Sequence, residues 1–101
     1  MLLNETIKLM LSEDYKERFV AEYWQTRIRY EKLKNFCNKI AAASFSLNVE
    51  EPKHDCSLGL LREQQRKMGE YLHILEVRAQ IENINLYDFL KKCKMTLNDT
   101  K

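Results

Sequence analysis

The stretch of sequence that decides the fold is LLREQQRKMGEYLHILEVRAQIENI, residues 60–84. It contains no proline and a single glycine, Gly69, so a helix can run through its whole length at modest cost. Leu61, Met68 and Leu75 recur every seven residues, which places them on one side of that helix. Three more apolar side chains flank this stripe: Tyr71, Leu72 and Ala79. The stripe is wide enough to be buried against a second helix.

A second apolar stripe lies further round the same helix. Its members are Ile74, Val77, Ile81 and Ile84. A single neighbouring helix covers only one face, so this second stripe is expected to need another partner. Arg78 stands at the rim of the first stripe, seven residues after Tyr71. A cation beside an aromatic ring at a helix–helix seam is a favourable place for a planar, anionic ligand.

The composition indicates one small, all-α domain covering residues 1–101. Apolar residues make up 45% of the 101 residues and charged residues 32%, which is typical of a globular chain. Two glycines and one proline are too few for the turns of a β-fold. The net charge is only +2 and the charges alternate in sign, without the basic stripe of a DNA- or RNA-duplex binder.

The predicted architecture is a long antiparallel helical hairpin with short N- and C-terminal helices. The long helices are expected at about residues 13–42 and 57–84, with Ser12 capping the first and Ser57 or Asp55 capping the second. Asn83 and Asn85 are the expected stop signals of the second helix. The apolar side chains of the first long helix form one broad stripe: Phe19, Val20, Tyr23, Trp24, Ile28, Tyr30, Leu33, Phe36, Cys37 and Ile40.

The remaining segments are expected to pack against this hairpin. Residues 2–11 predict a short amphipathic helix that docks through Leu3, Ile7, Met10 and Leu11. Residues 44–56 contain Pro52 and form the connection, in which Phe45, Leu47 and Val49 are expected to pack under the hairpin tip. A last short helix is predicted from Leu86, Phe89, Leu90 and Cys93.

No arrangement of residues predicts catalysis, a metal site or a bound cofactor. Cys37, Cys56 and Cys93 lie far apart without zinc-ligand spacing, and we interpret them as structural thiols of a reducing cytosol. His54 beside Asp55 lacks a nucleophile at a matching spacing, so a solvated loop histidine is the better interpretation. No apolar run reaches the roughly 20 residues of a membrane span, and the N-terminus does not resemble a signal peptide. We expect a soluble, non-enzymatic protein without a membrane partner.

Two segments together resemble a known family. The first is DYKERFVAEYWQTRIRYEKLKNF, residues 14–36, with a Glu-Lys-Leu motif ending at Leu33; the second is LLREQQRKMGEYLHILEVRAQI, residues 60–81. The ordered pair resembles the helical hairpin domain of phage anti-CBASS and anti-Thoeris nucleotide sponges. Each motif alone is weak, and the pair joined by a short connection is more specific. The longer connection 41–56 and the extra C-terminal helix depart from the family pattern.

The resemblance implies a function and an assembly. Such proteins sequester cyclic oligonucleotide immune signals in the cytoplasm of the infected bacterial host without cleaving them, and they assemble as homo-oligomers, commonly hexamers. One branch prefers cyclic di- and trinucleotides, and another takes a cyclic ADP-ribose-type signal. The second branch carries an added β-strand segment, which this sequence lacks, so cyclic di- and trinucleotides are the expected ligands. The alternatives are a cyclic ADP-ribose-type ligand, or an oligomerisation or protein-interaction module without any small ligand.

The resemblance also implies the ligand-binding residues. An aromatic near the start of the first long helix, a lysine near the Glu-Lys-Leu motif and a late arginine correspond to Tyr15, Lys32 and Arg78, with Lys34 as an alternative to Lys32. A second chain is expected to bring Lys32 and Tyr15 opposite Arg78. The competing interpretation is structural: the lysines are surface residues and Arg78 pairs with a glutamate across the hairpin.

Overall fold

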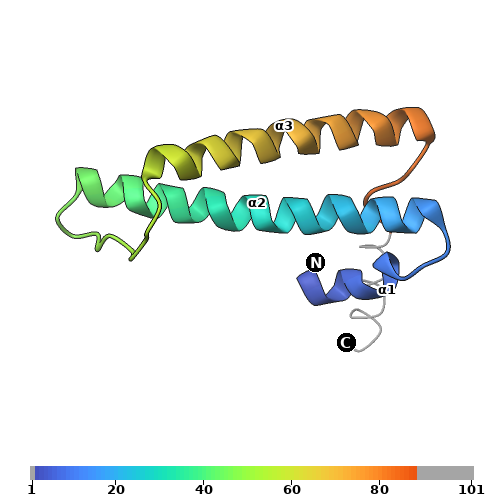
Figure 1. Ribbon diagram of the computed structural model, residues 1–101, viewed down its shortest axis with the longest axis horizontal. Helices are drawn as coiled ribbons and strands as arrows, with labels where there is room; N and C mark the ends of the chain where they lie inside the picture. The colour runs from blue at the N-terminus through green and yellow to red at the C-terminus, as the bar shows by residue number, and fades with distance from the viewer. Residues whose placement is uncertain (1, 89–101) are drawn as a thin grey trace.

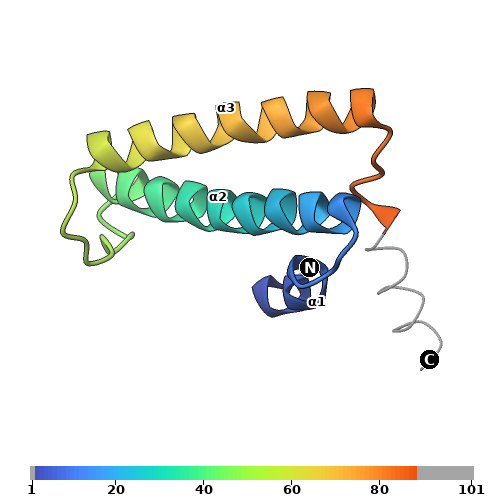
Figure 2. The same ribbon diagram turned by 45° about the vertical axis from the view of Figure 1, so that its right-hand side comes forward.

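The computed structural model describes residues 2–88, and every regular element in that range is a helix. A 3₁₀ turn, η1 (Leu3–Thr6), leads into the short helix α1 (Ile7–Met10), and the two long helices α2 (Tyr15–Phe45) and α3 (Leu58–Glu82) follow. The chain reverses between α2 and α3, which lie side by side, while α1 packs near the start of α2 (Figures 1 and 2). The all-helical prediction is confirmed for the described residues. No helix among them is long and apolar enough to cross a membrane.

Side chains at the helix ends explain where the long helices begin and stop. The Asp14 carboxylate caps α2 by accepting a hydrogen bond from the Lys16 backbone N–H at 2.9 Å. The prediction that Ser12 caps this helix is wrong, because the Ser12 hydroxyl accepts a hydrogen bond from the backbone N–H of Asp14 at 3.0 Å. Ser57 caps α3 as predicted, by accepting from the N–H of Leu60 at 3.2 Å. Asn83 ends α3 in the left-handed conformation, with φ 56° and ψ 48°, as its stop-signal role requires.

The far end of α2 differs from the prediction. The helix continues to Phe45, because Ala41–Ala43 are strong helix formers and Pro52 lies too far downstream to stop it. The predicted packing of these side chains is wrong, since Phe45 and Leu47 are almost fully exposed and Val49 is 38% exposed. The connecting segment that follows α2 is mostly polar and offers few apolar side chains to cover them. The predicted C-terminal helix lies mostly beyond residue 88, outside the described residues.

The core forms where the start of α2 meets the end of α3. Tyr23 and Leu75 are fully buried at its centre. Helix α1 contributes Leu9, and the segment after α3 contributes Ile84 and Leu86. The rest of the core comes from the facing sides of the two long helices: Phe19, Val20, Ala21, Trp24, Leu72 and Ala79. This arrangement fixes the backbone at one end of the α2–α3 pair.

The N-terminal turns dock through a different face from the one predicted. Ile7, Met10 and Leu11 are exposed, whereas Leu9 and Thr6 are buried. The Thr6 hydroxyl donates to the Leu3 carbonyl at 2.6 Å and accepts from a side-chain amide of α2. The first turn is a 3₁₀ helix, which rotates the following residues relative to a continuous α-helix. That change of register brings Leu9 to the core.

Among residues 2–88, most of the second apolar stripe of α3 is exposed. Ile74 is 54% exposed, Val77 is 45% exposed and Ile81 is 77% exposed. Ile84 leaves this stripe because the chain turns at Asn83 and carries its side chain into the core. We call Ile74, Val77 and Ile81 the apolar stripe of α3.

Candidate functional site

A cluster of side chains joins the first turn of α2 to the last turns of α3. Arg78 donates a hydrogen bond from Nη2 to the Tyr15 hydroxyl at 2.7 Å and another from Nε to Glu82 Oε2 at 3.0 Å. The Tyr15 hydroxyl donates in turn to Glu82 Oε1 at 2.9 Å. Three side chains from two helices therefore form a closed ring of hydrogen bonds. The reversal of the chain between α2 and α3 brings the start of α2 beside the end of α3 (Figure 1), and this allows Tyr15 to contact Arg78.

Phe19 provides a fixed base beneath this ring. The guanidinium carbon of Arg78 lies 5.0 Å from the centre of the Phe19 ring, in the geometry of a cation–π contact. Tyr15 meets Phe19 edge to face with ring centres 6.2 Å apart, as residues four apart on one helix can. Phe19 is only 3% exposed, so the core holds its ring in place. We call Tyr15, Phe19, Arg78 and Glu82 the Arg78 site.

The charges of the Arg78 site are fixed at neutral pH. The pKa of the Glu82 carboxyl is lowered, chiefly by the hydrogen bond from Tyr15; desolvation opposes this effect, and the hydrogen bond and charge of Arg78 add to it. The pKa of Tyr15 is raised, chiefly by its hydrogen bond to Glu82. Arg78 uses Nε and Nη2, and its Nη1 donates to no residue between 2 and 88. A guanidinium beside two aromatic rings can bind a phosphate oxygen or stack on a nucleobase.

Lys32 and Lys34 do not join this site within one chain. Both are exposed on α2. Lys32 lies 17 residues after Tyr15, or about 25 Å along a helix that rises about 1.5 Å per residue. Of the four residues predicted to bind ligand, one chain thus brings Tyr15 and Arg78 together and keeps Lys32 and Lys34 apart from them.

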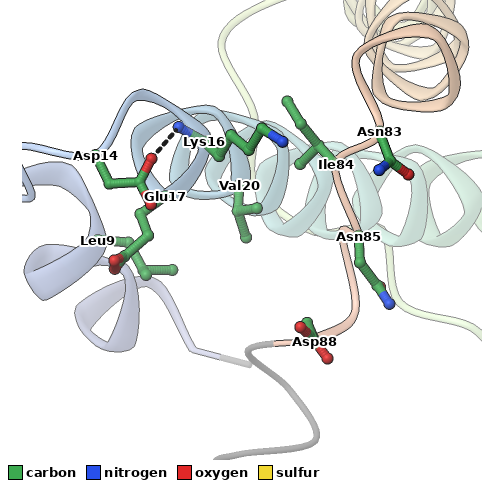
Figure 3. A pocket seen from close by; sticks show the side chains of 9 residues that line it. All are labelled: Leu9, Asp14, Lys16, Glu17, Val20, Asn83, Ile84, Asn85 and Asp88. Carbon is green, nitrogen blue, oxygen red and sulfur yellow. Dashed lines mark hydrogen bonds between the residues drawn. The ribbon is translucent and has the colours of Figure 1, made fainter.

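A cavity of about 310 Å³ opens near the Arg78 site, and its electrostatics are unfavourable for an anion (Figure 3). Its walls come from α1, the start of α2 and the segment after α3. The carboxylates of Asp14, Glu17 and Asp88 line it, against the single cation of Lys16. The other lining residues are Leu9, Val20, Asn83, Ile84 and Asn85. This excess of carboxylates disfavours an anionic ligand in the cavity.

The sequence did not predict a second arginine cluster, around Arg27. The Arg27 guanidinium lies 5.0 Å from the centre of the Trp24 ring and donates from Nη1 to the hydroxyls of Tyr23 at 3.1 Å and Tyr87 at 2.9 Å. Trp24 Nε1 donates to the Leu86 carbonyl at 2.7 Å. The spacing of Tyr23, Trp24 and Arg27 on one helix was the available signal. These contacts hold the segment after α3 against α2, which is a structural role.

The histidine of the connection has a local structural environment. His54 Nδ1 lies 2.7 Å from the Cys56 carbonyl oxygen, and its ring meets Phe36 edge to face. Glu51 Oε2 lies 3.9 Å from His54 Nε2. Within residues 2–88, no group of three or more His, Cys, Asp or Glu side chains is placed to hold a metal ion.

Comparison with known families gives one match. A protein-family profile described as Sequestin matches residues 13–81, which is more than half of the chain. The matched range contains Tyr15, Phe19 and Arg78, and it ends one residue before Glu82. No curated protein and no solved structure matches the chain significantly.

Proposed function

Because the chain belongs to the Sequestin family of phage anti-CBASS and anti-Thoeris cyclic-nucleotide sponges, we propose that it captures a cyclic oligonucleotide immune signal intact. The family binds signals and does not transform them, so the chain acts by lowering the concentration of free signal in the cytoplasm of the infected host. Cyclic di- and trinucleotides are the first ligands to test. A cyclic ADP-ribose-type signal is the second.

The Arg78 site is the observation that supports this proposal most directly. A nucleotide offers a phosphodiester anion and a flat base, and the site offers a guanidinium beside the Tyr15 and Phe19 rings. A guanidinium binds phosphate oxygens through paired hydrogen bonds, and aromatic rings stack on bases. The aromatic core residue Phe19 holds the guanidinium in position before a ligand arrives, which reduces the entropy lost on binding.

Self-association is part of the proposal. A cyclic dinucleotide has two phosphates and two bases, and one chain supplies a single Arg78 site. The apolar stripe of α3 lies on the same helix as Arg78 and is exposed in one chain, which suits it to contact a second copy. In such an assembly Lys32 or Lys34 of a neighbouring copy adds the further cation. Following the family resemblance, we propose six copies.

Titration calorimetry of the wild type and of Arg78→Ala with a cyclic dinucleotide, a cyclic trinucleotide and a cyclic ADP-ribose-type ligand tests this function. We expect Arg78→Ala to lose at least about tenfold in affinity, because it removes a charge-assisted hydrogen-bond donor. Arg78→Lys should recover only part of the loss, since lysine keeps the charge without the planar fork. Arg66→Ala is the matched control, because Arg66 is an exposed arginine of α3 with pairs to Glu63 and Glu70.

Two further measurements, recovery of the ligand and thermal unfolding, separate the competing classes of function. Ligand recovered unchanged after incubation and denaturation supports a sponge, and cleaved ligand supports an enzyme. If no cyclic nucleotide raises the thermal unfolding midpoint, the protein-interaction module is favoured, because any ligand that binds only the folded state must raise that midpoint. Equal affinities for the wild type, Arg78→Ala and Arg78→Lys would exclude Arg78 from the site.

A further inference from the structure

Glu82 occupies the two groups that the proposed function assigns to the ligand. Its Oε2 atom accepts from Arg78 Nε at 3.0 Å, and its Oε1 atom accepts from the Tyr15 hydroxyl at 2.9 Å. A carboxylate that bridges a guanidinium N–H and a phenol O–H supplies the same two acceptor oxygens and the same negative charge as a phosphodiester. Glu82 therefore fills the anion position of the site with a group of the protein's own.

We propose that Glu82 is a specificity-determining residue: an intramolecular competitor that an incoming phosphate must displace from Arg78 and Tyr15. This inference rests on the proposed function and names what sets its selectivity. When a ligand offers only one phosphate, that phosphate replaces the Glu82 carboxylate on Arg78, and little binding free energy is gained. A ligand that also stacks a base and reaches further cations gains enough to move Glu82 aside. The site then rejects mononucleotides and free phosphate in favour of larger, multivalent signals.

The surroundings of Glu82 fit a displaceable group. On α3 it faces Arg78, and on α2 it faces Tyr15 and the charge of Lys16. Its side chain is 31% exposed, so water can solvate the carboxylate once it leaves Arg78. Exposed ion pairs of this kind, four residues apart on one helix, are individually weak. The Glu82 carboxylate therefore binds Arg78 strongly enough to oppose a lone phosphate and too weakly to exclude a ligand that makes several contacts.

Glu82→Gln is the informative variant. Glutamine keeps the length of the side chain and an oxygen acceptor for Tyr15, and it removes the negative charge. The probes are adenosine monophosphate and inorganic phosphate, followed by chemical-shift titration at low ionic strength. We expect Glu82→Gln to bind both roughly three- to tenfold more tightly than the wild type, the range for losing an exposed ion pair and a nearby like charge. The gain for a cyclic dinucleotide should be smaller.

Two controls make the result specific. Glu70→Gln removes the same charge from an exposed ion pair with Arg66 on the same helix, at 2.8 Å, and should leave phosphate binding unchanged. The double variant Arg78→Ala/Glu82→Gln should lose the gain. Equal phosphate affinity of Glu82→Gln and the wild type, an equal gain in Glu70→Gln, or a gain that survives loss of Arg78 would each overturn the proposal.

Failure of the Glu82 proposal can be distinguished from failure of the proposed sponge function. If the wild type binds no cyclic nucleotide while Glu82→Gln gains phosphate binding through Arg78, the competitor is supported and the sponge function fails. If the wild type binds a cyclic nucleotide and Glu82→Gln gains nothing, the sponge function stands and the competitor is rejected. Glu82→Ala provides a second variant with the same expected direction should the glutamine variant fold poorly.

Discussion

Tyr23 is the residue at which the core and the polar network of the protein meet. It is fully buried, donates to Glu76 Oε2 at 2.6 Å and accepts from Arg27. Burial raises the pKa of its hydroxyl well above 10, and the hydrogen bond to Glu76 raises it further. The neutral phenol is therefore strongly favoured in the folded state over the tyrosinate.

This shift predicts an alkaline limit to stability that depends on Tyr23. A pKa that is higher in the folded than in the unfolded state gives a stabilisation that is complete below about pH 10 and declines as the pH rises above that value. In Tyr23→Phe this part of the decline should disappear, although the variant is less stable at neutral pH because its partners lose a hydrogen bond. Urea midpoints measured from neutral to strongly alkaline pH test it. Parallel pH profiles for the two proteins would contradict it.

Single residues of the Arg78 site were predictable to different degrees. Tyr15 and Arg78 were predicted as ligand-binding residues from their positions in the sequence. We expected a second chain to supply Tyr15, whereas α2 and α3 bring Tyr15 to Arg78 within one chain. Glu82 and Phe19 were missed. Each lies four residues from its partner on the same helix, and that spacing is too common among helical residues to single out a pair.

At the scale of the element, α3 presents one buried and one exposed apolar face. Leu75 is fully buried, so Leu75→Ala should lower the free energy of unfolding by ~2–5 kcal/mol, the usual cost of such a cavity. Leu60→Ala is the matched control, because Leu60 lies on the same helix, is 60% exposed and is outside the apolar stripe of α3. Denaturant unfolding at a fixed protein concentration measures both. A negligible effect of Leu75→Ala would mean that the helix packs in another register.

The helix ends show why some boundaries were predictable. Ser57 and Asn83 act through local chemistry, an N-cap hydroxyl and a tolerated left-handed conformation, and local chemistry is visible in sequence. Ser12 and Asp14 are both good caps two residues apart, and only the packed structure selects Asp14. The exposure of Phe45 and Leu47 depends on what surrounds the connection, which an apolar pattern in a loop does not reveal.

At the scale of the whole molecule, one α2–α3 pair leaves the apolar stripe of α3 exposed to water, and a stripe of this kind usually marks an interface. We predict that the protein is a homo-oligomer of six copies in solution, held together in part by the apolar stripe of α3. Light scattering after gel filtration measures the mass. Ile81→Glu, which places a charge on a 77% exposed position, should reduce the mass and leave the helical circular-dichroism signal unchanged. A wild type with the mass of one chain at micromolar concentration would exclude this assembly.

Trp24 gives the protein a fluorescence signal that reports on one location in the fold. It is the single tryptophan of the chain and is 7% exposed. Its indole N–H donates to the Leu86 carbonyl, and its ring meets the Tyr87 ring edge to face with centres 5.7 Å apart. Fluorescence excited selectively at the indole therefore comes from one place, the junction between α2 and the segment that follows α3. Release of that segment into water would shift the emission to the red while the long helices remain paired. A red shift without loss of the helical circular-dichroism signal therefore reports local detachment, and a red shift together with that loss reports global unfolding.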